Sequence, residues 1–403
     1  MSTNLLSEPS ISRTTPDSTS HFLDKAKALR QLIETEAEGA EKNGALPLSI
    51  VNAMRDAGLF WLLCPRELGG AGESVRTYIS VLEEVSCADG STGWTLQANS
   101  TATTMAALYC SDENVAHMFG GSHMPVMALT FAPTGRASEQ DGIFKGGGRY
   151  SFGSGVAHAD WVSGAMMLFD GDKPRLHANG KPAMIEAFVP RSEVKLHGNW
   201  NVTGMQGTGS FDFEISERTW PAAWTFDHFF NPPRRGGAVA RMGNYAVACA
   251  GHVGVVLGIA KRALEELART ALARRRLGSS ETIASGAVFR SEFMHHEALF
   301  RAARALVFEV YADAEKTANA GEQLSSLELA RIRQAVTWTH KVAREVAQYA
   351  FSAAGSSSIR KPSAIDRCVR DVMVAAQHIL VEPMSIVEAA PGVIEDWAAN
   401  RAG

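Results

Sequence analysis

The stretch WNVTGMQGTGSFDFEIS, residues 200–216, carries the pattern that decides the fold. From Ser210 onward, the apolar residues 211, 213 and 215 alternate with polar ones, as in a β-strand with one buried face. The glycine cluster before this strand runs into it, whereas the glycine fingerprint of a dinucleotide-binding domain must follow a strand and open a helix. The stretch therefore predicts a strand in a β-domain and argues against a Rossmann fold.

Further short β-like runs flank this strand, and helical patterns lie on both sides of them. We expect strands at Val126–Phe131, Tyr150–Phe152, Trp161–Leu168 and Met184–Val189, within a middle β-domain of residues 123–232. An N-terminal helical domain is expected over residues 22–122, with its first helix near 22–42. Long helical segments near 238–276, 285–318 and 324–353, followed by one near 363–380, predict a four-helix bundle over 233–385. Residues 1–21 and 386–403 are expected to be tails.

The composition excludes several classes of function. The chain has 403 residues, 45% of them hydrophobic, and 39 basic against 43 acidic residues. This balance offers no basic surface for nucleic acid and no polybasic patch for a membrane. Five scattered cysteines indicate reduced thiols, so we expect a cytoplasmic protein. The most apolar run, residues 245–260, contains His252 and three glycines and is shorter than the ~20 residues needed to span a bilayer, which favours a core helix.

Two clusters of polar residues have a simple structural interpretation. His295, His296 and Glu297 are adjacent, whereas two histidine ligands on one helix need i, i+4 spacing; we therefore expect a solvated helix face and no metal. Arg274, Arg275 and Arg276 could close a helix by favourable interaction with its dipole, or could bind a phosphate. The residues alone leave these two roles open.

Four stretches, in this order along the chain, resemble motifs of the acyl-CoA dehydrogenase superfamily, and more closely of its flavin-dependent monooxygenases. They are CADGSTGW (87–94), FAPTGRASEQDGIFKGGGRYSFGSGVAHADW (131–161), WNVTGMQGTGSFDFEI (200–215) and AAGSSSIRKPSAIDRCVRDVMVAAQH (353–378). The resemblance implies an α+β fold with an N-terminal helical domain, a middle β-barrel-like domain and a C-terminal four-helix bundle, usually in a homotetramer.

The resemblance also implies a flavin site between the β-domain and the bundle. The residues that it places at the flavin are Thr130, Phe131, Phe152, Ser154, Gly355 and Ser356, with Arg276 reaching a flavin phosphate on a neighbouring subunit. Trp94 would line the substrate pocket. Gly153 stands where relatives often carry a hydroxyl, which leaves the hydrogen-bond donor to flavin N5 open between Ser154 and a backbone N–H.

The choice between dehydrogenase and oxygenase depends on one base. A dehydrogenase needs a carboxylate to remove the α-proton of an acyl thioester. The resemblance places this carboxylate near Ile379 or at about Asn244, and neither position carries one. His378 instead matches a histidine that faces the flavin in the hydroxylases, where a base assists the attack of a phenol or similar nucleophile on a flavin C4a-hydroperoxide.

The sequence therefore predicts the oxygenase component of a two-component monooxygenase that hydroxylates an aromatic or related ring compound, with His378 as its catalytic residue. The expected cofactor is reduced FMN, slightly favoured over reduced FAD, with O₂ as co-substrate and a separate NAD(P)H-dependent flavin reductase as partner. The alternatives are an acyl-CoA dehydrogenase or oxidase with a displaced base, a flavin-dependent N-oxygenase of amino sugars, and an inactive flavin-binding scaffold. A dehydrogenase would hold FAD tightly and be reduced by an acyl-CoA, whereas a two-component oxygenase would consume O₂ only with reduced flavin.

Overall fold

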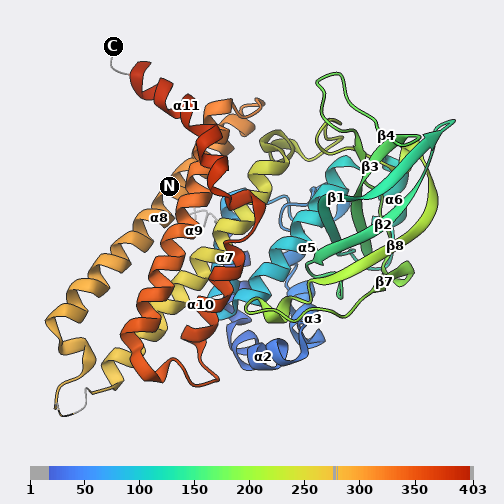
Figure 1. Cartoon of the computed structure of the whole chain (residues 1–403). Helices are drawn as coiled ribbons and strands as arrows, with labels where there is room; N and C mark the ends of the chain where they lie inside the picture. Colours follow the sequence, from blue (N-terminus) through green and yellow to red (C-terminus); the bar gives the residue numbers. More distant parts are fainter. Residues whose placement is uncertain (1–17, 276–277, 279, 400–403) are drawn as a thin grey trace, which may run out of the picture.

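The computed structural model describes residues 18–275, 278 and 280–399, and the order of its elements is helices, then a sheet, then helices (Figure 1). The N-terminal region contains α1 (Ser18–Ala28), α2 (Arg30–Asn43), α3 (Leu48–Asp56), α4 (Val75–Ala88), α5 (Gly90–Tyr109) and α6 (Asp112–Phe119). The single helix expected near 22–42 is divided at Leu29. Helix α1 begins at Ser18, inside the expected tail 1–21. Residues 1–17 of that tail lie outside the described residues.

The middle region is a mixed sheet. Its strands are β1 (Met127–Gln140), β2 (Ile143–Gly153), β3 (Trp161–Asp170), β4 (Lys173–Pro174), β5 (Met184–Ile185), β6 (Val189–Pro190), β7 (Val194–Leu196) and β8 (Phe211–Pro221). The order is β4-β3-β1-β2-β8-β7, with β5 and β6 also paired to β3. Strands β1 and β3 are parallel, and the other pairs are antiparallel. The strand predicted at 210–216 is thus confirmed as part of β8, whose Phe213 stacks on Tyr150 in the core of the sheet.

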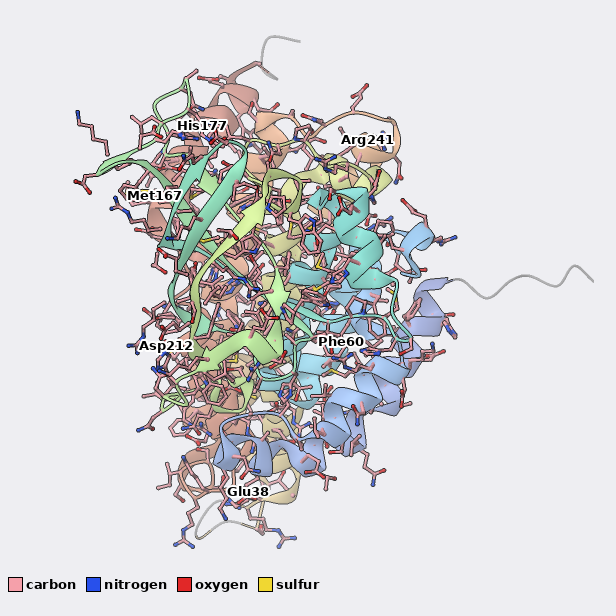
Figure 2. All side chains as sticks on the ribbon, turned by 90° about the vertical axis from the view of Figure 1, so that its right-hand side faces the viewer. Glu38, Phe60, Met167, His177, Asp212 and Arg241 are labelled. Carbon is pink, nitrogen blue, oxygen red and sulfur yellow. The ribbon has the colours of Figure 1, made fainter. Side chains whose placement is uncertain are left out.

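Seen from the sheet side, the β-domain lies beside the N-terminal helices (Figure 2). Met167 on β3 and Asp212 on β8 mark the sheet. Phe60, which is completely buried, marks the core of the N-terminal helices. Helix α5 packs on both β1 and α7, so it joins the sheet to the bundle. A residue on α5 can therefore reach both.

The C-terminal region consists of long helices, as predicted. They are α7 (Gly237–Ala273), α8 (Ala287–Asn319), α9 (Ser326–Ala354) and α10 (Ala364–Ala375). Helix α9 begins with a capping box between Ser325 and Glu328. Helix α7 is long and apolar enough to cross a membrane, but 83% of its most apolar window is buried inside the protein.

The chain beyond residue 385 corrects the expected tail 386–403. Residues Pro383–Ala399 form α11, which packs along α9. Two ion pairs hold this helix to α9, between Arg331 and Asp396 (2.8 Å) and between Arg333 and Glu388 (3.2 Å). The segment is therefore a helix in contact with α9 rather than a free tail.

Glycines on one face of α7 allow it to pack closely on α4 and α5. A Cβ atom on Gly251 would lie 2.6 Å from Oε1 of Gln97, and one on Gly254 would lie 2.7 Å from Cβ of Leu82. Gly258 meets the backbone of Glu83 and Cys87 in the same way. The absence of side chains here therefore fixes how near α7 approaches the N-terminal helices.

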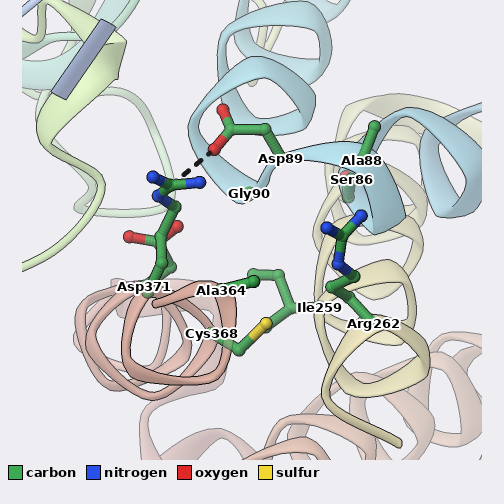
Figure 3. Close-up of a pocket in the computed structure, with 10 residues that line it drawn as sticks. Ser86, Ala88, Asp89, Gly90, Ile259, Arg262, Ala364, Cys368 and Asp371 are labelled. Atoms are coloured by element: carbon green, nitrogen blue, oxygen red, sulfur yellow. Dashed lines mark ion pairs between the residues drawn. The ribbon is translucent and has the colours of Figure 1, made fainter. Parts of the chain in front are cut away.

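A group of charged residues, which we call the charged junction, joins the three regions, and Figure 3 shows two of its members, Asp89 and Asp371. Asp371 Oδ1 on α10 accepts a 2.6 Å hydrogen bond from the backbone N–H of Met205, before β8. Arg370 binds Glu41 on α2, at 2.7 Å. Asp89 caps α5 by accepting from the N–H of Thr92 and lies 4.0 Å from Arg367 of α10. The junction thus comprises Glu41, Asp89, Arg367, Arg370 and Asp371.

A cavity of about 10 Å³ lies within the charged junction, a size that suits one water molecule. Four buried polar atoms that have no hydrogen-bond partner among the described residues belong to residues that line it: Ser86 Oγ, Asp89 Oδ1, Arg262 Nε and Arg367 Nε. Burial, followed by the charge of Asp89, raises the pKa of Asp371 to about 8. The motif that carries Arg370 and Asp371 therefore has a structural role, because its charged residues connect the three regions.

Candidate active site

A directed chain of hydroxyl groups holds Trp94 of α5 against the sheet. The hydroxyl of Thr208 donates to the carbonyl of Met205 (2.9 Å), so it can only accept from Ser210 (2.7 Å). Ser210 must in turn accept from Ser154 (2.8 Å), whose oxygen accepts from Trp94 Nε1–H (3.0 Å). Each N–H or O–H proton in this series of hydrogen bonds therefore has an acceptor. The Ser154 hydroxyl thus positions Trp94 in this arrangement, and its own proton is directed to Ser210 rather than to a ligand.

Four rings from four segments meet next to this chain. His252 of α7 lies between Trp94 and His378, at ring-centroid distances of 5.0 and 4.3 Å, and His340 of α9 lies 5.8 Å from it. The rings of Trp94 and His378 are 6.0 Å apart. We call these four residues the aromatic cluster. His252 and His340 are each only 2% exposed.

His378 is held in one tautomer by its own backbone. It precedes the short helix Ile379–Val381, and its Nδ1 accepts a 3.3 Å hydrogen bond from the N–H of Leu380. A neutral ring whose Nδ1 is an acceptor carries its proton on Nε2. A histidine in water titrates near pH 6.5, but burial lowers the pKa of His378 to about 4. At neutral pH, His378 therefore presents an Nε2–H donor, and its catalytic role stays a prediction.

The other two histidines of the cluster are neutral as well. Burial lowers the pKa of His340 to about 4, and burial together with His378 and His340 lowers that of His252 well below its usual value. Nδ1–H of His340 donates to the carbonyl of Val336 (2.8 Å), which leaves its Nε2 as an acceptor. That nitrogen and Nδ1 of His252 are buried without a partner among the described residues.

Thr130 and Phe131 lie where β1 separates from β3. The pairing of these strands is interrupted after Thr130 and resumes at Gly135. The hydroxyl of Thr130 is buried without a partner in the described part of the chain. Phe131 packs edge-on against His228 at 4.9 Å, and His228 Nδ1 lies 3.0 Å from the wholly buried carboxylate of Glu186. This loop therefore offers a ligand one free hydroxyl and one aromatic edge.

The remaining predicted flavin residues divide into two places. Phe152, on β2, has a positive φ of 61°, uncommon for a residue with a side chain, and its ring is 72% exposed beside Trp200. Gly355 and Ser356 follow α9 and line a separate cavity of about 450 Å³ that also contains Arg274 and Arg275. Arg276 lies outside the described residues.

Within one chain, this second cavity is not at the aromatic cluster. Figure 1 places the end of α7, the start of α8 and the end of α9 at the end of the bundle away from the sheet. The structure thus brings together Trp94, Ser154 and His378, but not Gly355 and Ser356 with them.

The structure also shows what the sequence analysis missed. His252 was noted only as a polar residue in an apolar run, and His340 and Ser210 were not considered. An isolated histidine in the run YAVACAGHVGVVLGIA was the available signal for His252. The expectation of a solvated helix face is wrong for His296, which is buried because its ring stacks on Tyr349 at 3.9 Å. Asn244, at the second place for a dehydrogenase base, donates to the backbone carbonyl of His228 (3.0 Å).

Comparison with known proteins shows the family to which the chain belongs. Residues 20–119 match the family model "Acyl-CoA dehydrogenase, N-terminal domain", and residues 250–383 match "Acyl-CoA dehydrogenase, C-terminal domain". The chain is 30% identical to an indole-3-acetate monooxygenase of Pseudomonas putida over 82% of each chain. It belongs to the flavin-dependent monooxygenases of the acyl-CoA dehydrogenase superfamily. An indole-3-acetate monooxygenase of Acinetobacter baumannii is 25% identical over 88% of this chain and 90% of its own.

A solved structure agrees with the fold of this monooxygenase. XiaF from a Streptomyces species, in complex with FADH2 and glycerol, has a TM-score of 0.85 at 21% identity, covering 94% of this chain and 96% of its own. The predicted α+β fold is confirmed, as is the enzyme class: an oxidoreductase that uses reduced flavin and O₂. The dehydrogenase alternative is not supported.

The residues of this monooxygenase fit a flavin by their chemistry. The unpaired hydroxyl of Thr130 can bind a polar ring atom, and the exposed face of Phe152 can pack on a planar ring. At the second cavity, Arg274 and Arg275 supply charge for phosphate, and a Cβ on Gly355 would meet nothing within 4 Å, so backbone can approach a ligand there.

Proposed function

We propose that this monooxygenase is the oxygenase component of a two-component system and hydroxylates an aromatic ring compound at the aromatic cluster. The observation that carries the proposal is the meeting of Trp94, Ser154 and His378 from three distant segments, with His252 between the rings. Aromatic walls with few polar groups suit a flat, largely apolar substrate. The relatives named as indole-3-acetate monooxygenases support a substrate of this class.

The chain's own residues would bind, orient and shield the reactants. Reduced flavin, when bound, supplies the electrons with which O₂ is activated for insertion of one oxygen atom. Thr130, Phe131 and Phe152 would hold its ring system, and Trp94 would form a wall of the substrate site. His378 would direct its Nε2–H toward the oxygen atom that gains negative charge as the substrate is hydroxylated. A preorganised donor in a buried site stabilises such charge. Burial of the cluster keeps bulk water from the reactants.

We further propose a cytoplasmic homotetramer supplied with reduced FMN or FAD by a separate NAD(P)H-dependent reductase. The separation of the Arg274–Arg275 cavity from the aromatic cluster supports a site shared between subunits, with Arg276 beside a flavin phosphate of the neighbour. All five cysteines are free and buried, which suits a reducing compartment. A stable, active monomer in light scattering would contradict the shared site.

Oxygenation of a ring compound tests the function directly. The full-length protein is supplied with a flavin reductase, NADH, FMN, ¹⁸O₂ and either indole or a phenol. We expect a hydroxylated product that carries one ¹⁸O atom and is absent when the reductase is omitted. Reduction of protein-bound flavin by an acyl-CoA without oxygen would instead assign the chain to the dehydrogenases.

A further inference from the structure

Three histidines are buried in the long helices of the bundle, and two of them satisfy a ring nitrogen in the same way. Nδ1–H of His296 donates to the carbonyl of Glu292 (2.7 Å), four residues earlier, and Nδ1–H of His340 donates to that of Val336 (2.8 Å). His252 does not follow this pattern. Its Nδ1 is fully buried and has no partner among the residues that the structure describes. Buried polar groups are rarely left unpaired, so this nitrogen points to a ligand.

The position of His252 supports the same conclusion. Its ring is within 5.0 Å of Trp94 and 4.3 Å of His378, the two residues that the proposed function places at the substrate. His340 lies on its other side, and in the described part of the chain His340 has a ring contact with His252 alone. His252 is therefore the inner residue of the cluster that adjoins both proposed substrate-contacting rings.

The two central histidines also have complementary hydrogen-bonding roles. His378 uses Nδ1 as an acceptor for its own backbone, so its remaining ring nitrogen is a donor. A substrate that carries an N–H or O–H group needs an acceptor, which His378 does not offer. His252 stays neutral because burial and the neighbouring histidines lower its pKa, so one of its ring nitrogens bears a lone pair.

We propose that His252 contacts the substrate and that its Nδ1 accepts a hydrogen bond from a ring N–H or phenolic O–H. Loss of this partner would leave a buried group unpaired, so the site would select rings that carry a donor over rings of the same shape without one. This proposal rests on the proposed function, because it requires a ring compound at the aromatic cluster.

Two bicyclic compounds of nearly equal shape test the proposal. Indole carries a ring N–H, and benzothiophene does not. Their binding to the full-length protein is measured by calorimetry, with and without oxidised FMN. We expect the wild type to bind indole about tenfold more tightly, the effect of one neutral hydrogen bond in a buried site. His252→Phe, which keeps an aromatic ring, should lose this preference and retain its affinity for benzothiophene.

Two further variants separate hydrogen bonding from packing. His252→Asn places a polar atom near the position of Nδ1 and should keep part of the preference, even if the Phe variant fails to fold. His296→Phe removes a buried helical histidine whose nitrogen is already paired, and it should keep the full preference.

Each outcome has one meaning. Equal affinity of the wild type for the two rings, or an undiminished preference in His252→Phe, would overturn the role of His252. If the Phe variant does not fold, an undiminished preference in His252→Asn would overturn it as well. The ¹⁸O₂ assay on wild type is unaffected by these results, so ring oxygenation with no preference would refute His252 alone. Failure of the wild type to bind or oxygenate any ring compound would refute the proposed function itself.

Discussion

Helix α5 takes part in two buried polar groups that differ in kind. Asp89, just before its first residue, belongs to the charged junction, where carboxylates face arginines of α10 and a backbone N–H. Trp94, five residues later, belongs to the aromatic cluster, where burial keeps three histidines neutral and two ring nitrogens have no partner among the described residues. The junction uses charge to connect domains, whereas the cluster leaves hydrogen-bonding capacity free for a ligand.

The contrast gives a way to separate framework from function. Buried charges stabilise a fold only when they are paired, so loss of one partner at the junction should reduce stability. Unpaired neutral groups reduce stability in the free protein and gain their partners on binding. Substitutions at the junction should therefore change the free energy of unfolding, and substitutions at the cluster should change catalysis and binding.

The largest expected effect is that of His378→Ala on catalysis. Loss of the Nε2–H donor should reduce product formation by about 10²–10⁴-fold, while O₂ consumption continues and H₂O₂ is released. The ratio of product to H₂O₂, measured with the same reductase, reports this change. Thermal unfolding should change much less than catalysis, because among the described residues the ring makes one 3.3 Å hydrogen bond and otherwise only ring contacts with Trp94 and His252. If the variant keeps the wild-type ratio of product to H₂O₂, His378 has only a structural role. The distinction between the charged junction and the aromatic cluster would then not hold.

The opposite result is expected for Asp371→Leu. Removal of the carboxyl group leaves the buried Met205 N–H without its acceptor, at a cost of about 1–3 kcal/mol in the free energy of unfolding. Urea denaturation measures the loss. Asp371→Asn is the matched control, because its amide oxygen can still accept from Met205 and should lose much less stability. A fall in the product to H₂O₂ ratio of folded Asp371→Asn would show that the junction also acts in catalysis.

The pH dependence of stability should have opposite signs in the two groups. His340 has a pKa of about 4 when folded and about 6.5 when unfolded, so the unfolded chain binds more protons between these values and stability rises with pH there. Over this pH range, the contribution of His340 to the free energy of unfolding changes by about 3 kcal/mol. His340→Phe should reduce this slope in denaturation curves from pH 4 to 6.5. For Asp371 the folded pKa is the higher one, so its contribution falls as pH rises toward 8 and is absent from Asp371→Asn.

The smallest expected effect is that of Ser154→Ala. Trp94 Nε1–H loses its acceptor, and the chain through Ser210 loses its first hydroxyl, at a cost of about 1 kcal/mol in stability. The variant should stay folded, yet its product formation should fall, because Trp94 is less well positioned as a wall of the substrate site. Thr208→Val provides a comparison at the far end of the same chain. If both variants lose activity equally, the whole hydroxyl chain positions Trp94.

The sequence was sufficient for the order of the three regions, the strand within β8 and the long bundle helices, because these depend on local periodicity and on turn residues. Family resemblance, rather than local pattern, predicts Trp94, Ser154 and His378 as site residues, and the structure places them close together. His252 and His340 were missed because a buried unpaired nitrogen can be recognised only when its neighbours are known. Gly355 and Ser356 lie apart from the cluster, at a separate cavity, because their place depends on where α9 ends in space, which the local pattern does not give. Helix α11 was missed because its anchoring partners, Arg331 and Arg333, are on another helix.

The glycine face of α7 has a consequence for how the substrate range of this enzyme can change. His252 lies between Gly251 and Gly254, whose missing side chains set the distance of α7 from α4 and α5. Any larger residue at Gly251 or Gly254 would push the helix outward and move His252 with it. Substitutions that admit new substrates should therefore arise in α5 and in the segment around His378. Helix α7 keeps its position and limits the size of the ring that fits.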